Sequence, residues 1–188
     1  MSSSTDTRVS VILNLHTLLF GLLLARASVV AYAGLVQPTP FLEAPDDVPY
    51  ASTVFHLVVG AVFGALVLVP YARAPHRVLR GVALASASAA IYYFTIRFVV
   101  GGPAGLSALA SFMIAGACAA LLCGAAVAFI APQPFSLRLA ALLVVAGALG
   151  GAVFDSQVSF DPNLLLGHAA WQLLVCLALY FGQRNVPT

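Results

Sequence analysis

Long apolar runs, broken at intervals by clustered proline and glycine, are the feature that most constrains this sequence. Six runs lie at about residues 10–36, 50–70, 80–100, 105–131, 136–154 and 163–182. A helix needs about 20 mainly apolar residues to cross a bilayer. Only 7% of the residues are charged, against about 25% in soluble chains. The chain is therefore predicted to be an integral membrane protein.

Helices are the expected secondary structure of every run. Backbone N–H and C=O groups in lipid must be satisfied within the spanning segment. A membrane barrel would show short strands of alternating polarity, whereas these runs are continuously apolar. Proline and glycine at the breaks end the helices. We expect an all-α, polytopic bundle of six transmembrane helices, forming one domain over residues 1–188 with the first run retained as a span.

The arginines predict how this bundle is oriented. With six spans, the arginines of the termini and of two loops fall on one side: Arg8, Arg73, Arg77, Arg80, Arg138 and Arg184. Basic loops remain in the cytoplasm, so both termini should be cytoplasmic, in what we expect to be a bacterial inner membrane. The acids then fall on the outer side: Glu43, Asp46, Asp47, Asp155 and Asp161.

A few polar side chains remain within the apolar runs or directly at their ends. Five of them come from five different runs and, in this topology, all lie in the outer half of the bilayer: Arg26, His56, Arg97, Asp155 and His168. Charged groups inside a membrane usually face the protein interior or a cavity. We therefore expect one shared polar cavity that opens outward. For Arg97, snorkelling to the membrane surface is the alternative.

Two helix faces carry the histidines. Ser52, His56, Gly60 and Gly64 recur at every fourth residue and form one stripe, which is expected to face another helix because small residues allow close approach. The alternative role for His56 is a hydrogen bond across that interface. In the last run, His168 and Gln172 lie one turn apart, with Trp171 beside them at the level where an interfacial aromatic residue is expected.

Two short motifs resemble those of a known family. Ser52-Thr-Val-Phe-His56 looks like the SxxxH motif of the alkaline ceramidase group, within the membrane hydrolase superfamily that includes adiponectin-receptor proteins, and His168-Ala-Ala-Trp-Gln172 resembles its last-helix HAxWH motif. The resemblance implies a zinc ion on His56 and His168, beside Ser52, that activates water to cleave a lipid amide. Catalytic zinc usually has three protein ligands. Because Gln172 stands where the family has a second histidine, Asp155 would supply the third ligand.

Three functions are compatible with these residues. The first is binding, without catalysis, of a membrane lipid, a quinone-like molecule or a partner subunit, with these ligand contacts: Arg26, Arg97, Trp171 and Gln172. The second is zinc-dependent lipid amide hydrolysis, with these catalytic residues: Ser52, His56, Asp155 and His168. The third is a haem subunit with both histidines as axial ligands. The net charge of +2 is too small to indicate nucleic acid, and a homo-oligomer remains open.

Overall fold

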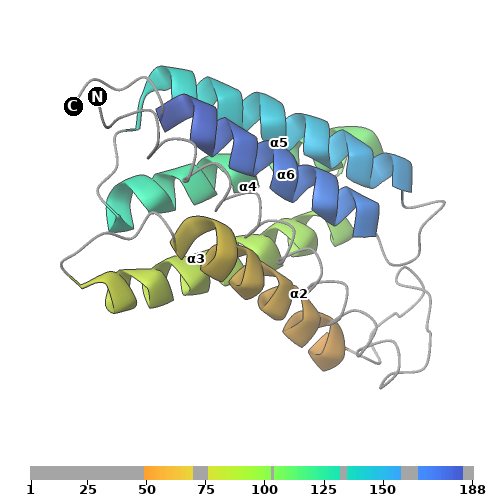
Figure 1. Ribbon diagram of the computed structural model, residues 1–188. Coiled ribbons are helices and arrows are strands. Elements are labelled where there is room, and N and C mark those ends of the chain that lie inside the picture. Colours follow the sequence, from red (N-terminus) through yellow and green to blue (C-terminus); the bar gives the residue numbers. More distant parts are fainter. Residues whose placement is uncertain (1–48, 70–75, 103, 132–134, 158–164, 184–188) are drawn as a thin grey trace.

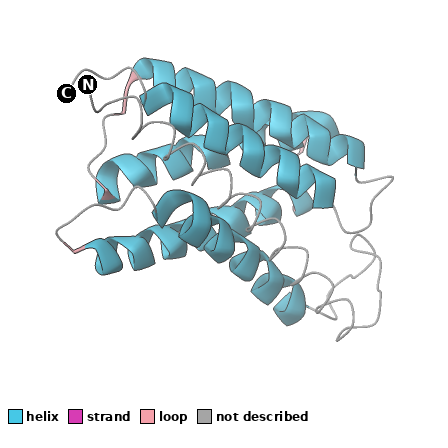
Figure 2. Cartoon of the chain, in the orientation of Figure 1, coloured by secondary structure: helices cyan, strands magenta, loops and turns pink. Residues whose placement is uncertain are grey.

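The structure is a computed structural model that describes residues 49–69, 76–102, 104–131, 135–157 and 165–183 (Figure 1). The predicted first span and Arg26 lie outside these residues. The elements are α2 (Pro49–Phe63), a π-helical turn η1 (Gly64–Leu68), α3 (Arg77–Val100), α4 (Ala108–Ile130), α5 (Leu137–Gln157) and α6 (Leu165–Gln183). The described part contains helices and short loops but no strand (Figure 2), which confirms the all-α prediction.

Three of these helices are long and apolar enough to cross a membrane: Arg77–Val100, Ala108–Ile130 and Leu137–Ser156. They correspond to the third, fourth and fifth predicted spans, and they identify the chain as an integral membrane protein. The flanking apolar stretches, His56–Leu68 and Gly167–Gly182, are shorter. Arg77 and Arg80 were expected in a loop, but α3 already begins at Arg77.

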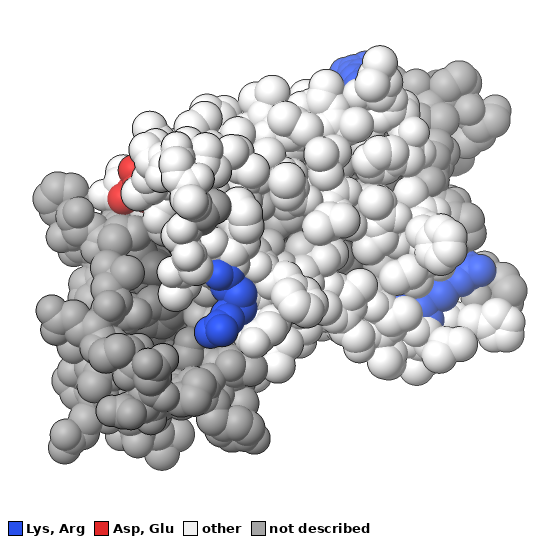
Figure 3. Space-filling model, turned by 180° about the vertical axis from the view of Figure 1, so that it is seen from behind, with Lys and Arg blue, Asp and Glu red and all other residues white. Residues whose placement is uncertain are grey.

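Consecutive helices run antiparallel and pack side by side, in the order α2, α3, α4, α5 and α6 (Figure 1). Arg77 and Arg80 in the first turn of α3 therefore lie at the same end of the bundle as Arg138 in the first turn of α5. Arg97 and Asp155, in the last turns of these helices, lie at the other end. On the face in Figure 3, the charged atoms lie towards the two ends and flank a broad uncharged surface, as a membrane requires.

Glycine sets the distance between α2 and α3. A Cβ atom on Gly60 would lie 2.6 Å from the Cβ of Tyr92, and one on Gly64 would lie 2.7 Å from the Cα of Ala85. Both distances are far shorter than van der Waals contact, so the two helices approach this closely only because the side chains are missing. The prediction that this stripe faces another helix is confirmed for both glycines, and the partner is α3.

Glycine contacts also join α4 to α5 and α5 to α6. A Cβ atom on Gly147 of α5 would meet the carbonyl oxygen of Gly116 and lie 2.8 Å from the Cα of Ala117 on α4. A Cβ atom on Gly150 would lie 2.7 Å from the Cα of Trp171 on α6. In lipid, van der Waals packing between small residues is a main source of helix association. Glycine contacts therefore hold α2 on α3, and hold α5 on both α4 and α6.

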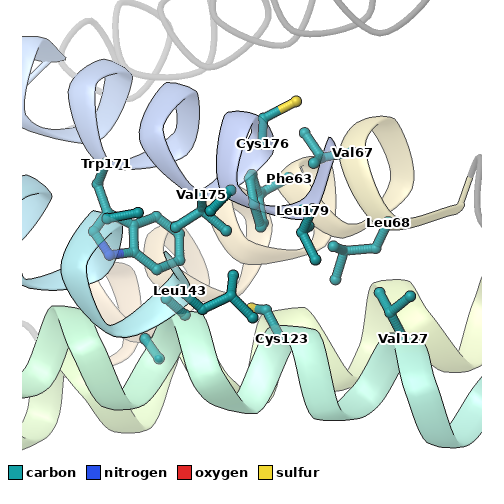
Figure 4. Close-up of a cluster of buried hydrophobic side chains, with 14 of the residues drawn as sticks. Phe63, Val67, Leu68, Cys123, Val127, Leu143, Trp171, Val175, Cys176 and Leu179 are labelled. Carbon is teal, nitrogen blue, oxygen red and sulfur yellow. The ribbon is translucent and has the colours of Figure 1, made fainter. Parts of the chain in front are cut away.

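Larger apolar side chains fill the interior between the helices. Figure 4 shows Phe63 and Leu68 of α2 and η1, Leu143 of α5 and Val175 and Leu179 of α6 converging on one buried cluster. Outside, large apolar side chains are exposed along the helices, including Phe129 at 90% and Leu137 at 88%. An apolar exterior of this kind suits lipid rather than water.

The glycine contacts predict a large effect of added volume. Gly147→Val should lower the free energy of unfolding by about 1–3 kcal/mol, the usual cost of overpacking, because its side chain meets the backbone of α4. Ala141→Val, at an exposed position of the same helix, is the matched control and should have little effect. Reversible unfolding in mixed micelles, followed by circular dichroism, measures both. Equal effects of the two changes would contradict the packing described.

Candidate functional site

Two of the predicted site residues meet in the interior, around a third residue that sequence analysis did not single out. His56 of α2 and His168 of α6 are only 3% and 5% exposed. The ring centroid of Tyr92 on α3 lies 6.4 Å from that of His56 and 5.4 Å from that of His168. We call these three residues the His–Tyr–His cluster. Of the five side chains expected to share one cavity, these two histidines lie beside the same residue, Tyr92.

A hydrogen bond ties the cluster together. The Tyr92 hydroxyl bonds to Nδ1 of His168 and lies 3.3 Å from its Nε2. A neutral imidazole has one donor and one acceptor nitrogen, so the phenol donates to Nδ1 or accepts from it according to the tautomer. Phe154 of α5 meets the His168 ring edge-on, with centroids 4.6 Å apart. The His168 ring is thus held by contacts from both α3 and α5.

Close helix contacts place these side chains at one level. His56 lies one turn before Gly60, whose missing side chain lets α2 touch the Cβ of Tyr92. Gly167 precedes His168, and a Cβ atom there would lie 2.9 Å from Cδ1 of Phe154. His56 and His168 therefore each lie close in sequence to a glycine at a helix contact, and Tyr92 is the residue that Gly60 touches. All three lie in the half of the bundle where α3 ends and α6 begins.

Trp171 and Gln172 are buried beside the cluster, each 4% exposed. The Trp171 indole N–H donates a hydrogen bond of 3.2 Å to the carbonyl oxygen of Gly116 on α4. Its ring centroid lies 6.4 Å from that of Tyr92. Trp171 was expected at the level of an interfacial aromatic residue, and the structure shows its side chain buried and turned towards α4.

The predicted charged members of the site do not join the cluster. Arg97 is exposed at the end of α3, as the snorkelling alternative requires. Asp155 is half-buried, and it follows Phe154, which faces His168. Successive residues of an α-helix point about 100° apart, so Asp155 is directed elsewhere. Ser52 lies in α2, but its side chain, like the whole of Arg26, is outside what the structure describes.

The donor set does not fit the zinc ion that the family resemblance implies. Among the described residues, no group of three or more His, Cys, Asp or Glu side chains could hold a metal ion. The three-ligand set of His56, Asp155 and His168 is therefore not assembled, and two histidines fall short of the usual three ligands. A haem bridging the two imidazoles would have to take the place of Tyr92, which lies against both.

An apolar groove borders the cluster. It lies among α3, α4, α5 and α6 and opens to the outside. Its lining includes Tyr92, Ile96, Val99, Phe112, Phe154 and Trp171. A polar cavity was expected here from the sequence. The described lining is instead apolar, because the charged side chains next to it in sequence, Arg97 and Asp155, point to other faces of their helices.

Comparisons with known proteins give no neighbour from which a function could be transferred. No model of a protein family, no curated protein and no solved structure matches the chain. The resemblance to alkaline ceramidases therefore rests on its two short motifs alone. Any function assigned to the chain has to rest on the chemistry of its described residues.

Because the described residues offer zinc only two histidines, we expect that zinc does not stabilise this fold. Dialysis against EDTA should leave the thermal unfolding midpoint unchanged. Metal analysis by mass spectrometry should find no zinc bound in a one-to-one ratio to the protein through His56 and His168. His56→Ala and His168→Ala are the test variants, with His76→Ala, at the exposed start of α3, as the control. Stoichiometric zinc that is lost in both test variants and retained in the control would contradict this prediction.

Proposed function

We propose that this protein binds a lipid-like or small amphipathic ligand in the groove beside the His–Tyr–His cluster, without altering it chemically. Tyr92 carries the proposal. Its ring lines the apolar groove, while its hydroxyl is hydrogen-bonded to His168. The apolar lining suits the body of an amphipathic ligand, and the Tyr92–His168 pair places polar groups beside the groove, as small-molecule sites usually do.

The lining of the groove supports the proposal. Small-molecule sites are mostly apolar clefts with a few placed polar groups, and this groove is lined mainly by apolar side chains. Its opening gives a ligand a route in from outside the bundle. A hydrolase of the alkaline ceramidase type is less well supported, since the described residues offer zinc two histidines but not a third ligand.

We also propose that the chain has six spans, with both termini in the cytoplasm of a bacterium. The positive-inside rule supports this orientation, because Arg77, Arg80 and Arg138 lie at one end of the bundle and Asp155 at the other. The groove would then open in the outer half of the membrane, since it is lined by Val99 near the end of α3 and by residues of early α4.

Cysteine labelling tests this orientation. In a variant without the three native cysteines, Ala104→Cys in the loop between α3 and α4 should react with a membrane-impermeant maleimide in intact cells. Phe135→Cys, in the loop between α4 and α5, should react only after the membrane is opened. Both positions are exposed. The opposite pattern of labelling would invert the proposed topology.

Ligand retention tests the groove itself. Native mass spectrometry of the purified protein should detect a bound amphipathic molecule, and Val99→Phe should remove it because the larger side chain fills the groove. Val100→Phe is the matched control, since Val100 is the next residue but is 65% exposed on the outer face. A wild-type protein that carries no ligand, or equal retention by the two variants, would contradict the proposed function.

A further inference from the structure

Gln172 is a buried polar side chain of α6 that has no hydrogen-bond partner among the described residues. It is only 4% exposed. Its neighbours are hydrogen-bonded, His168 to Tyr92 and Trp171 to the Gly116 carbonyl, but no described residue forms a hydrogen bond with the Gln172 amide. An amide without a hydrogen bond is unfavourable inside an apolar bundle. We therefore expect its partner to come from another part of the chain.

Gln172 lies on the flank of α6 that is turned away from α5. Gly150 of α5 touches Trp171, and successive residues of an α-helix point about 100° apart. On that flank lies α2, on the same near face of the bundle as α6 in Figure 1. α2 packs closely on α3 and α6 on α5, whereas α2 and α6 meet mainly through side chains, such as Phe63 with its ring centroid 5.4 Å from that of Trp171.

The outer surface formed by α2 and α6 is apolar and available for a further helix. We call it the α2–α6 face, and its large apolar side chains are 37–40% exposed: Leu57, Val58, Leu173 and Leu177. The first predicted span, residues 10–36, has the right direction for this face. It precedes α2, so in an alternating bundle it would run antiparallel to both α2 and α6. Only residues 37–48 separate it from the start of α2, and consecutive helices usually lie next to each other.

The depth of Arg26 in the first predicted span matches that of Gln172. Arg26 lies ten residues before the outer end of its apolar run at residue 36, and Gln172 lies nine residues after the outer start of its run at residue 163. At about 1.5 Å per residue, both are about 14–15 Å deep. A guanidinium has five N–H donors and no acceptor, and a glutamine amide oxygen is an acceptor. Each side chain therefore supplies what the other lacks.

The other faces of the bundle match Arg26 less well. The outer end of α3 carries Arg97, which is exposed and has the same charge. Asp155 directly follows the outer end of the fifth run, about 15 Å above the level of Arg26. On α4, Ile114 is exposed in the outer half but is apolar. An arginine within the membrane usually faces a polar partner inside the protein, and Gln172 lies at the matching depth.

We infer that the first predicted span packs on the α2–α6 face, where the Arg26 guanidinium donates a hydrogen bond to the amide oxygen of Gln172. The inference rests on the proposed six-span topology. In this arrangement, the first span covers the side of the His–Tyr–His cluster that α2 and α6 form. The groove stays open on its other side, because its described lining contains no residue of α2.

Two native cysteines allow a matched test of where the first span lies. Cys176 is one turn beyond Gln172 on α6, and Leu22 is one turn before Arg26. Cys118 is exposed on α4 and, like Cys176, lies thirteen residues from the outer start of its run. In membranes oxidised with copper phenanthroline, Leu22→Cys should form a disulfide with Cys176 when that is the only native cysteine kept. It should form none with Cys118 when only Cys118 is kept.

A third pairing covers the exposed side of α3. Ser86→Cys is exposed there and lies fourteen residues from the outer end of its run, as Leu22 does. A disulfide from Leu22→Cys to Ser86→Cys or to Cys118, in place of the one to Cys176, would overturn the inference. A disulfide to Cys176 that joins two chains, seen as a dimer on a denaturing gel, would overturn it in favour of a second copy. Absence of all three disulfides would also overturn it.

A double-mutant cycle tests the hydrogen bond itself. Gln172→Leu leaves Arg26 without its acceptor and should lower the thermal unfolding midpoint. Arg26→Leu combined with Gln172→Leu should be at least as stable as Gln172→Leu alone, because the unpaired charge is removed as well. In the control, Arg97→Leu and Gln172→Leu should shift the midpoint additively, since Arg97 is exposed. Additive shifts in both pairs would overturn the Arg26–Gln172 hydrogen bond.

Failure of this inference can be told apart from failure of the proposed function. A disulfide to Cys176 in a protein that retains no ligand would leave the position of the first span standing while ligand binding falls. A ligand that is retained in wild type and lost in Val99→Phe, together with a disulfide to Cys118, would leave ligand binding standing and overturn the position of the span.

Discussion

Direct backbone contact between helices is the constraint on which the rest of this structure depends. Gly60 and Gly64 bring α2 onto α3, and Gly147 and Gly150 bring α5 onto α4 and α6, at distances that a single added methyl group would prevent. In a membrane, lipid competes equally well for apolar side chains, so close packing rather than burial from water selects the helix partners. The positions of the other interior side chains depend on these contacts.

The His–Tyr–His cluster is a consequence of that packing. Tyr92 is the residue whose Cβ faces Gly60, and the closeness of α2 and α3 at this point leaves its ring between two histidines from helices far apart in the sequence. Polar groups in an apolar interior must find partners within the protein. The hydrogen bond between Tyr92 and His168 and the one from Trp171 to the Gly116 carbonyl meet this need.

The predictions from sequence held where they depended on periodicity. Spacing by four residues identified the face of α2 that packs on another helix, and apolar runs identified α3, α4 and α5. His56 and His168, two of the five side chains expected to converge, both lie beside Tyr92. The predictions failed where they required the direction of a side chain. Asp155 was expected in the site, but Phe154 occupies that face.

By itself, the sequence determined that the chain is helical and lies in a membrane, because uninterrupted apolar runs leave the backbone no other way to satisfy its hydrogen bonds in lipid. It also determined which residues share a helix face. Only the tertiary structure decided which faces meet, and thereby that Tyr92 joins two histidines at the edge of an apolar groove. In the sequence, Tyr92 lies in an apolar run with nothing to distinguish it. Contact between α3 and Gly60 of α2 places its ring beside both histidines.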